Sequence, residues 1–117
     1  MNSSSKLIIN NIVNSIQKKK GYDIAILEVK ELSSLTDFFI ICSSDSDPQT
    51  RAITNCIKKD LSKTTIKPYQ IEGLEDLDWV LMDYHDIVIH IFKKEIREFY
   101  NIERLWADAK IKTIKND

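Results

Sequence analysis

The first helical pattern of the chain lies between Ser5 and about Lys20. Its apolar residues recur every three or four positions and so form one stripe on a helix, made by Ile8, Ile9, Ile12, Val13 and Ile16. Ser4 or Ser5 is the expected N-terminal cap. The run Lys18–Lys20 suits the negative end of the helix dipole, and Gly21 suits the position just past the helix.

Two further helices are expected later in the chain. Asp47 followed by Pro48 predicts a cap and a first helical residue, and the helix continues to about Thr64 with one apolar face, made by Ile53, Ile57 and Leu61. A last helix is expected from near Lys94 to about Lys110, with a bend at Asn101. Its apolar residues cover more than one stripe, which predicts that two of its sides are occupied.

Strand patterns occupy the segments between these helices. Residues 23–29 and the doubly apolar run 38–42 (FFIIC) read as neighbouring antiparallel strands, because the link between them is short. A short strand at 68–71 completes a strand–helix–strand crossover. The segment 79–92 (WVLMDYHDIVIHIF) predicts a β-hairpin.

The hairpin has one apolar face and one mixed face if its turn is His85-Asp86. Alternation along the two strands places every member of the first face inside the core: Val80, Met82, Tyr84, Ile87, Ile89 and Ile91. The second face is largely apolar but also carries an acid and a histidine: Trp79, Leu81, Asp83, Val88, His90 and Phe92. Either the last helix covers this face, or Trp79 and Leu81 stay partly open as an anchor for another protein.

These elements predict a single domain of the layered α/β (α+β) class, with a mixed sheet of about five strands and three helices. The core is expected over about residues 5–110, and the tail 111–117 is expected to be loose. Cys42 and Cys56 lie in apolar patterns, which predicts reduced core thiols in a cytoplasmic protein. The start, MNSSSKLIIN, lacks the uninterrupted apolar run of a secretory signal, and no run is long enough for a membrane span.

Charge is unevenly distributed although the net charge is only −1. From Glu72 to Asp86 there is no Lys or Arg, and the acids are Glu72, Glu75, Asp76, Asp78, Asp83 and Asp86. An acidic stretch beside apolar residues suits a basic protein partner better than a phosphate backbone. The run Lys18–Lys20 leaves two alternatives open, a charged helix end or a contact with RNA.

An enzymatic alternative rests on Asp45 and Asp47. Two carboxylates one residue apart can share a magnesium ion with a nucleotide's phosphates, as in nucleotidyl transfer. The chain has two glycines and no glycine-rich phosphate cradle, and the helix start already accounts for Asp47. Asp83 and His90 share a face, but no nucleophile accompanies them. The residues therefore predict neither a catalytic site nor a metal site.

Three segments together resemble the ribosomal silencing factor family, also called iojap-like. They are TDFFIICSSDSDPQTRAI at 36–53, DWVLMDYHDIVIHIF at 78–92 and KEIREFYNIERLWADA at 94–109. The resemblance covers the chain from about Ile24 to Ala109, and the run REFYNIERLW is its most specific part. The chain departs from the family in two places: His85 stands where members usually have glycine, and the loop SSDS replaces an SGTS-like one.

The resemblance implies a fold distantly like nucleotidyltransferases, without a working active site or a cofactor. It implies a protein that binds the large ribosomal subunit through ribosomal protein number fourteen of that subunit and sterically blocks joining with the small subunit. Translation is thereby repressed, and a role in late large-subunit assembly is also implied, as is a homodimer off the ribosome. In this chain Trp79, Leu81, Asp83 and Tyr84 match the docking motif, and His90 matches the histidine of the second hairpin strand.

The leading hypothesis is therefore a non-enzymatic ribosome-binding factor. Its docking surface is expected to have a Trp79 and Leu81 anchor, with charge from neighbouring acids: Asp76, Asp78, Asp83 and Asp86. A nucleotidyltransferase-like enzyme using Asp45, Asp47 and magnesium is the alternative. A homodimer that uses the second hairpin face is a third hypothesis.

Overall fold

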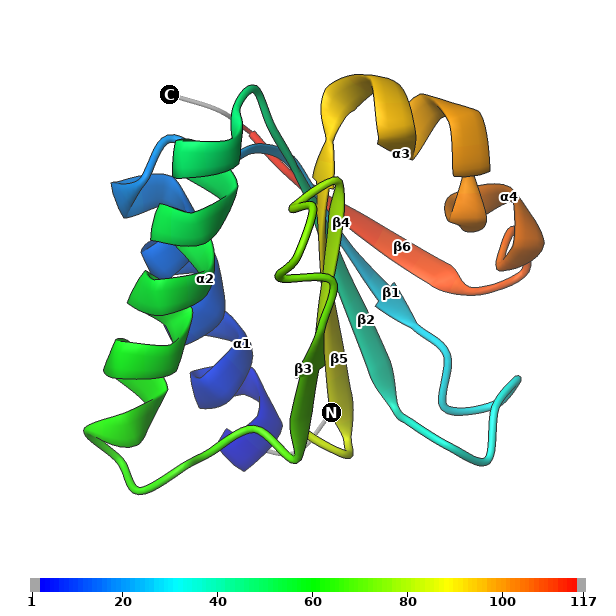
Figure 1. Cartoon of the computed structure of the whole chain (residues 1–117). Coiled ribbons are helices and arrows are strands. Elements are labelled where there is room, and N and C mark those ends of the chain that lie inside the picture. Colours follow the sequence, from blue (N-terminus) through cyan, green and yellow to red (C-terminus); the bar gives the residue numbers. More distant parts are fainter. Residues whose placement is uncertain (1–2, 116–117) are drawn as a thin grey trace.

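The structure is a computed structural model that describes residues 3–115. One six-stranded sheet separates two helical layers, with α1 and α2 on one side and α3 and α4 on the other (Figure 1). The elements in chain order are α1 (Ser3–Lys18), β1 (Tyr22–Glu28), β2 (Phe38–Ser44), α2 (Asp47–Ser62), β3 (Gln70–Glu72), β4 (Trp79–Asp83), β5 (Ile87–Lys93), α3 (Lys94–Tyr100), α4 (Ile102–Leu105) and β6 (Lys110–Ile114). Within the described residues, no helix is both long and apolar enough to cross a bilayer.

The sheet is mixed, with the strand order β3-β4-β5-β2-β1-β6. β2 and β5 are parallel, and the other neighbouring strands are antiparallel. The predicted layered α/β fold is confirmed, and so is the antiparallel pairing of β1 with β2. The doubly apolar β2 lies inside the sheet between β5 and β1, where both of its faces are covered.

The sixth strand corrects the expectation of a loose tail and of about five strands. β6 pairs with β1 from Ile24 opposite Ile114 to Glu28 opposite Lys110. Its sequence, KIKTI, is too polar to predict a buried strand, and four of its five residues are exposed. The open edge of β1 supplies the backbone partners, so tertiary context decides this strand. The last two residues of the predicted tail lie outside the described part of the chain.

Two helix starts differ from their predicted positions. α1 already includes Ser3, so it begins before either predicted cap. The cap of α2 is Ser46, whose Oγ accepts the Gln49 backbone N–H at 3.2 Å, and Asp47 is the first helical residue. Serine and aspartate are both good caps, so local preference could not choose between adjacent positions.

The predicted bend at Asn101 is a break. Asn101 adopts a left-handed backbone with φ of 43°, and it separates α3 from the short α4. Asparagine tolerates this conformation better than most residues do. α4 ends at Leu105, about five residues before the predicted end of the last helix. Because of the break at Asn101, α3 and α4 lie at an angle to each other over the sheet (Figure 1).

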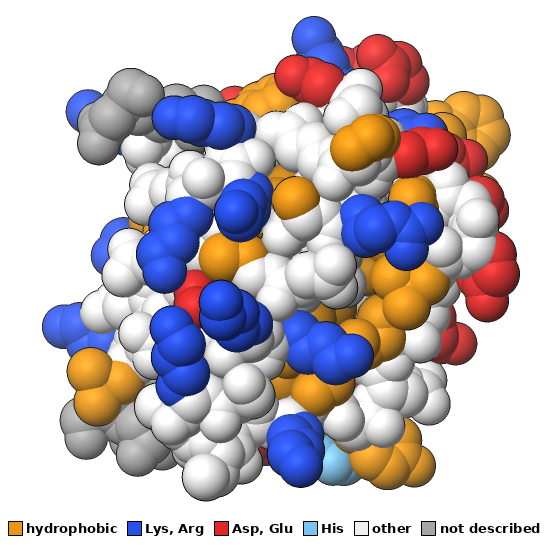
Figure 2. Space-filling view, turned by 60° about the vertical axis from the view of Figure 1, so that its left-hand side comes forward, with side chains coloured by type: hydrophobic (Ala, Val, Ile, Leu, Met, Phe, Trp, Pro, Cys, Tyr) orange, Lys and Arg blue, Asp and Glu red, His pale blue; other side chains and the backbone are white. Residues whose placement is uncertain are grey.

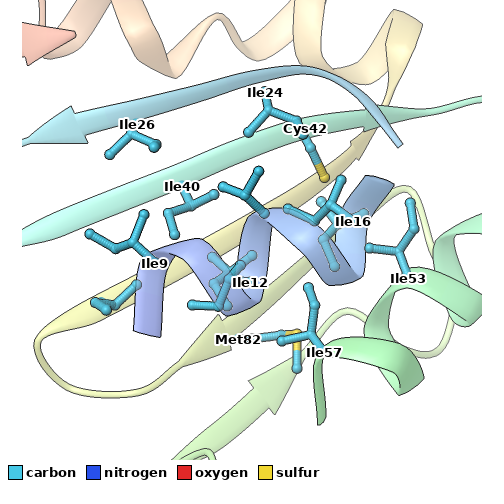
Figure 3. Close-up of a cluster of buried hydrophobic side chains, with 14 of the residues drawn as sticks. Ile9, Ile12, Ile16, Ile24, Ile26, Ile40, Cys42, Ile53, Ile57 and Met82 are labelled. Carbon is cyan, nitrogen blue, oxygen red and sulfur yellow. The ribbon is translucent and has the colours of Figure 1, made fainter. Parts of the chain in front are cut away.

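The main core lies between the sheet and the α1–α2 layer. Ile12 and Ile16 of α1 point towards Ile40 and Cys42 of β2, while α2 contributes Ile53 and Ile57 (Figure 3). The predicted stripes of both helices are thus buried. Burying such aliphatic side chains removes apolar surface from water and supplies most of the stabilisation of the fold.

The hairpin has the predicted register. Val80 pairs with Ile91 and Met82 with Ile89, and the Tyr84 N–H donates to the Ile87 carbonyl at 2.9 Å. The predicted apolar face joins the main core, with Tyr84 partly buried at its margin. His85 takes the left-handed position in the turn with φ of 71°, where a glycine would be unstrained.

Candidate functional site

The second face of the sheet carries a smaller apolar cluster beneath α3 and α4. Its buried members are Ala25, Leu27, Val29, Ile41, Phe92 and Ile102. Other apolar side chains pack against it but stay partly exposed: Phe39, Trp79, Ile96, Trp106 and Ala109. The last helical segment therefore covers part of the mixed hairpin face and leaves Trp79 and Leu81 partly exposed, while their role as an anchor for another protein stays a prediction.

Trp79 and His90 form a polar pair inside this apolar face. Trp79 Nε1 donates to His90 Nδ1 at 3.1 Å, and the indole stacks on Phe92 with ring centroids 4.7 Å apart. Phe39 meets the imidazole edge-on at 5.0 Å. Because Nδ1 accepts a hydrogen bond, the imidazole is neutral with its proton on Nε2.

His90 is 5% exposed, and its Nε2 has no hydrogen-bond partner among the described residues. Burial among aromatic rings disfavours the charged imidazolium and lowers the pKa of His90 to about 4. The side chain therefore stays uncharged at neutral pH and holds the indole of Trp79 in place. It does not present a charge to a partner.

An aromatic cluster extends from this pair to the protein surface. We use this name for Phe39, Trp79, His90, Phe92, Phe99, Tyr100 and Trp106. The ring centroid of Tyr100 lies 5.1 Å from that of Trp79 and 5.1 Å from that of Phe99. The rings therefore form a continuous series of contacts from the buried Phe92 to the exposed Phe99. Phe99 of α3 is 80% exposed and Leu105 of α4 is 78% exposed, which is unusual for such large apolar side chains.

The predicted site omitted Phe39, Phe99, Tyr100 and Leu105. For Phe99, Tyr100 and Leu105, the sequence signal was that apolar residues of the last helix cover more than one stripe. That signal predicted only that two sides of the helix are occupied. Ile96 of α3 and Ile102 of α4 pack on the sheet. Phe99 and Leu105 face solvent, and sequence periodicity cannot distinguish covered apolar residues from exposed ones.

Arg97 holds the two short helices against the sheet. Its guanidinium pairs with the Glu103 carboxylate of α4 through Nε and Nη2, at 2.9 and 3.0 Å. Its Nη1 donates to the Asp23 carbonyl at 2.6 Å and to Ser43 Oγ at 2.9 Å. One side chain thereby joins α3, α4, β1 and β2 and fixes the position of Phe99 and Tyr100.

The acids of the β3–β4 loop differ in exposure and in ion pairing within the protein. Asp76 is exposed, and its Oδ1 accepts the Asp78 backbone N–H at 3.1 Å. Asp78 Oδ1 lies 3.1 Å from Lys93 Nζ, which also pairs with Asp47. These two carboxylates raise the pKa of Lys93, Asp47 contributing most. Asp78 thus shares the single positive charge of Lys93 with Asp47, whereas Asp76 has no ion pair with a described basic residue.

The remaining predicted residues fall into two groups. Leu81 and Asp83 are half-buried on the same face as Trp79, and Asp83 Oδ1 accepts the His85 N–H at 2.8 Å. Asp86 is exposed in the turn at the far end of the hairpin from Trp79. Tyr84 points to the opposite, α1–α2 side, where burial raises the pKa of its phenol to about 12. In the described part of the chain its hydroxyl has no hydrogen-bond partner.

Asp45 and Asp47 have protein partners of their own. Tyr22 Oη donates to Asp45 Oδ1 at 2.5 Å, and that hydrogen bond raises the pKa of Tyr22 to about 12. Asp47 pairs with Lys93. Among the described residues, no group of three or more His, Cys, Asp or Glu side chains is placed to hold a metal ion. The geometry gives the two aspartates structural roles and so does not favour the nucleotidyltransferase alternative.

Comparison with known proteins gives consistent similarities over almost the whole chain. The family described as "ribosomal silencing factor during starvation" matches residues 2–117. The ribosomal silencing factor RsfS of Halalkalibacterium halodurans is 38% identical over 91% of this chain and 91% of that protein. RsfS of Bacillus subtilis is 36% identical over 91% of this chain and 90% of its own length.

Solved structures and an organellar protein extend the similarity. A crystal structure of a Chromobacterium violaceum protein has a TM-score of 0.84 and 29% identity, and covers 95% of this chain and 93% of that chain. A crystal structure of a Bacillus halodurans protein has a TM-score of 0.79 and 34% identity, and covers 94% of this chain and 98% of that chain. The mouse protein "mitochondrial assembly of ribosomal large subunit protein 1" is 31% identical over 88% of this chain and 46% of its own length.

Proposed function

This chain belongs to the ribosomal silencing factor family, and we propose that it binds the large ribosomal subunit and sterically prevents it from joining the small subunit. The proposed direct partner is ribosomal protein number fourteen of the large subunit. The proposal is regulatory and not enzymatic, because occupying a joining surface requires only a stable domain with a binding face. Because its proposed partner is the ribosome, we also propose that the protein is located in the cytoplasm.

The observation that carries this proposal is the open margin of the aromatic cluster. The Trp79 indole is held by His90 and Phe92, Tyr100 packs beside it, and Phe99 packs on Tyr100 and is largely exposed. Rigid aromatic side chains that are already held in position lose little entropy on binding and dominate the energy of many interfaces. We propose Trp79 and Leu81 as anchors, with Phe99 and Leu105 as additional contacts.

Acids at the margin would supply complementarity to a basic ribosomal protein. Asp76, Asp83 and, at the far end of the hairpin from Trp79, Asp86 are proposed contacts that steer the encounter, while Asp78 contributes less because it pairs with Lys93. Tyr84 and His90 match the family motif but point into the protein, so we propose that they support the surface from beneath.

Binding of the isolated large-subunit protein tests this proposal. Trp79→Ala should weaken binding by about 2 kcal/mol or more, as expected for a hot-spot residue. Because Trp79 also stabilises the fold, Phe99→Ala should be measured beside it. Its side chain is 80% exposed, so its removal should reduce affinity with little change in thermal stability. Leu7→Ala is the matched control, an exposed apolar residue on the opposite helical layer that should leave binding unchanged.

Normal binding by both folded variants would contradict the proposed surface, and absence of wild-type binding would contradict the proposed partner. Subunit joining should then be measured by light scattering, where added protein should reduce association of the two subunits in proportion to its occupancy. The homodimer stays a prediction, and sedimentation at several protein concentrations tests it.

A further inference from the structure

Basic side chains gather over the helical layer on the opposite side of the sheet from the aromatic cluster. Figure 2 shows Lys and Arg spread across this layer, while Asp and Glu collect mainly along its right-hand margin. We define the basic face by six exposed lysines on or just past α1 and α2: Lys18, Lys19, Lys20, Lys58, Lys59 and Lys63. The proposed docking surface uses none of them.

The acids of α1 and α2 do not cancel this charge. α1 contains no acid, and α2 contains only Asp47 and Asp60. Asp47 pairs with Lys93, which comes from the end of β5. In the described part of the chain, no carboxylate lies within ion-pair distance of Lys19, Lys20, Lys58 or Lys59. Most of the positive charge on the basic face is therefore available to an external anion.

Asp60 organises the centre of the basic face. Its Oδ2 accepts from Ser15 Oγ at 2.6 Å and from Lys18 Nζ at 3.1 Å, and its Oδ1 lies 3.6 Å from Lys63 Nζ. The Ser15 and Lys18 hydrogen bonds hold the pKa of the Asp60 carboxyl well below its usual range. One carboxylate thus brings lysines from two helices together and leaves a net positive charge between them.

A shallow groove of about 650 Å³ runs between the helices at this point. Asn11, Asn14, Gln17 and Lys18 of α1 line one side, and Asp60, Lys63 and Thr64 line the other, with the Asp60 carboxylate paired with both lysines. Amides and hydroxyls can donate hydrogen bonds to phosphate oxygens and to ribose hydroxyls, and lysines neutralise the phosphate charge. The groove therefore has the chemistry of a nucleic-acid backbone site.

The absence of aromatic residues narrows the class of partner. Neither α1 nor α2 contains Phe, Tyr or Trp, so this face offers no platform on which unpaired bases could stack. Leu7 is the one large apolar side chain strongly exposed on the described parts of these helices, which is too little for insertion into a lipid surface. A regular duplex backbone, recognised by charge and hydrogen bonds, fits both observations.

We propose that the basic face binds the phosphate backbone of double-stranded RNA. The choice of RNA rests on the ribosome-associated family of the chain, whereas the binding itself does not require the Trp79 surface. Together the two faces would let the protein contact a basic ribosomal protein through one side and a ribosomal RNA helix through the other.

Binding of a fluorescent 20-base-pair RNA hairpin, followed by anisotropy over a range of salt concentrations, tests this proposal. The variant Lys19→Ala/Lys58→Ala/Lys59→Ala removes three lysines that have no ion pair with a described carboxylate, and it should bind at least about tenfold more weakly at low salt, because phosphate contacts dominate such affinities. Its plot of log affinity against log salt should lose about two to three units of slope, roughly one for each lysine removed. All three side chains are exposed, so circular dichroism should report an unchanged fold.

The matched control is Lys30→Ala/Lys94→Ala/Arg104→Ala, which removes the same charge from exposed positions outside the basic face. It should keep RNA affinity within about twofold of the wild type. Equal losses in both variants, or no wild-type binding in low salt, would overturn the proposal, as would tighter binding to anionic lipid vesicles than to the hairpin. The lysine variant should still bind the large-subunit protein, so the two proposals can fail separately.

Discussion

The two sides of the sheet show how one small domain divides stability from recognition. Helices α1 and α2 cover most of one side and form a continuous core that includes Ile12, Ile57 and Met82. Helices α3 and α4 cover the other side only partly, so Trp79 and Trp106 remain at the boundary with solvent. The side that its helices cover more completely buries more apolar surface, whereas the partly covered side leaves rigid aromatic surface accessible to a partner.

The two sides also differ in how their helices are held. α1 and α2 are attached mainly by buried aliphatic side chains, which are non-directional. α3 and α4 are short and depend on the Arg97 network and on the apolar residues beneath them. Directional bonds fix the orientation of a small element whose buried area would not do so alone. The proposed binding side should therefore be the less stable and more easily perturbed one.

Neighbouring residues on β4 offer the sharpest test of this comparison. Met82 is fully buried on the α1–α2 side and Leu81 is half-buried on the other. Met82→Ala should lower the free energy of unfolding by about 3 kcal/mol, since it leaves a cavity, and Leu81→Ala by about 1 kcal/mol. Urea unfolding measures both values. Similar losses at the two positions would show that the two sides contribute equally to stability.

Acidification should weaken the second side through His90. Its pKa is about 4 in the folded protein and 6.5 in the unfolded chain, so the unfolded chain binds a proton first as the pH falls. Stability is unaffected above pH 6.5 and should fall by roughly 3 kcal/mol between pH 6.5 and 4. Comparing the wild type with His90→Gln by urea unfolding isolates this contribution. A variant with the same pH dependence as the wild type would show that His90 is not its source.

Removing Arg97 should loosen α3 and α4 selectively. Arg97→Ala should cost about 2 kcal/mol, because Glu103 and the Asp23 carbonyl lose a charged donor. Arg97→Lys should cost less, because it keeps the charge but not the bidentate geometry. Hydrogen exchange should accelerate in 94–105 while α1 and α2 keep their protection. Uniform acceleration across the chain would instead indicate that the two sides unfold together.

The smallest effect is expected at the hairpin turn, which belongs to neither helical layer. His85→Gly should raise the free energy of unfolding by about 0.5 kcal/mol, since it relieves the left-handed backbone strain at φ of 71°. The gain is limited because the imidazole contacts Tyr69, with ring centroids 4.7 Å apart. Thermal unfolding at neutral pH measures the change. A loss of stability would show that the ring contact outweighs the strain.

The sequence by itself determined the patterns that depend on local repetition. Alternation along residues 79–92 was sufficient for the hairpin register and for its core face, because a shift of one residue would expose every apolar side chain on that face. The apolar stripes of α1 and α2 and the break at Asn101 follow from equally local preferences. The motifs that identify the family also lie in continuous segments, and the comparisons confirm that family.

Only the tertiary structure decided the features that depend on contacts between elements distant in the sequence. β6 exists because β1 has an open edge, and Asp78 is partly neutralised because Lys93 ends a neighbouring strand. The same applies to the aromatic cluster, whose rings come from β2, β4, β5 and the last helices and meet only after folding. The physical reason is that burial and pairing are properties of two surfaces in contact, while a sequence pattern describes one surface at a time.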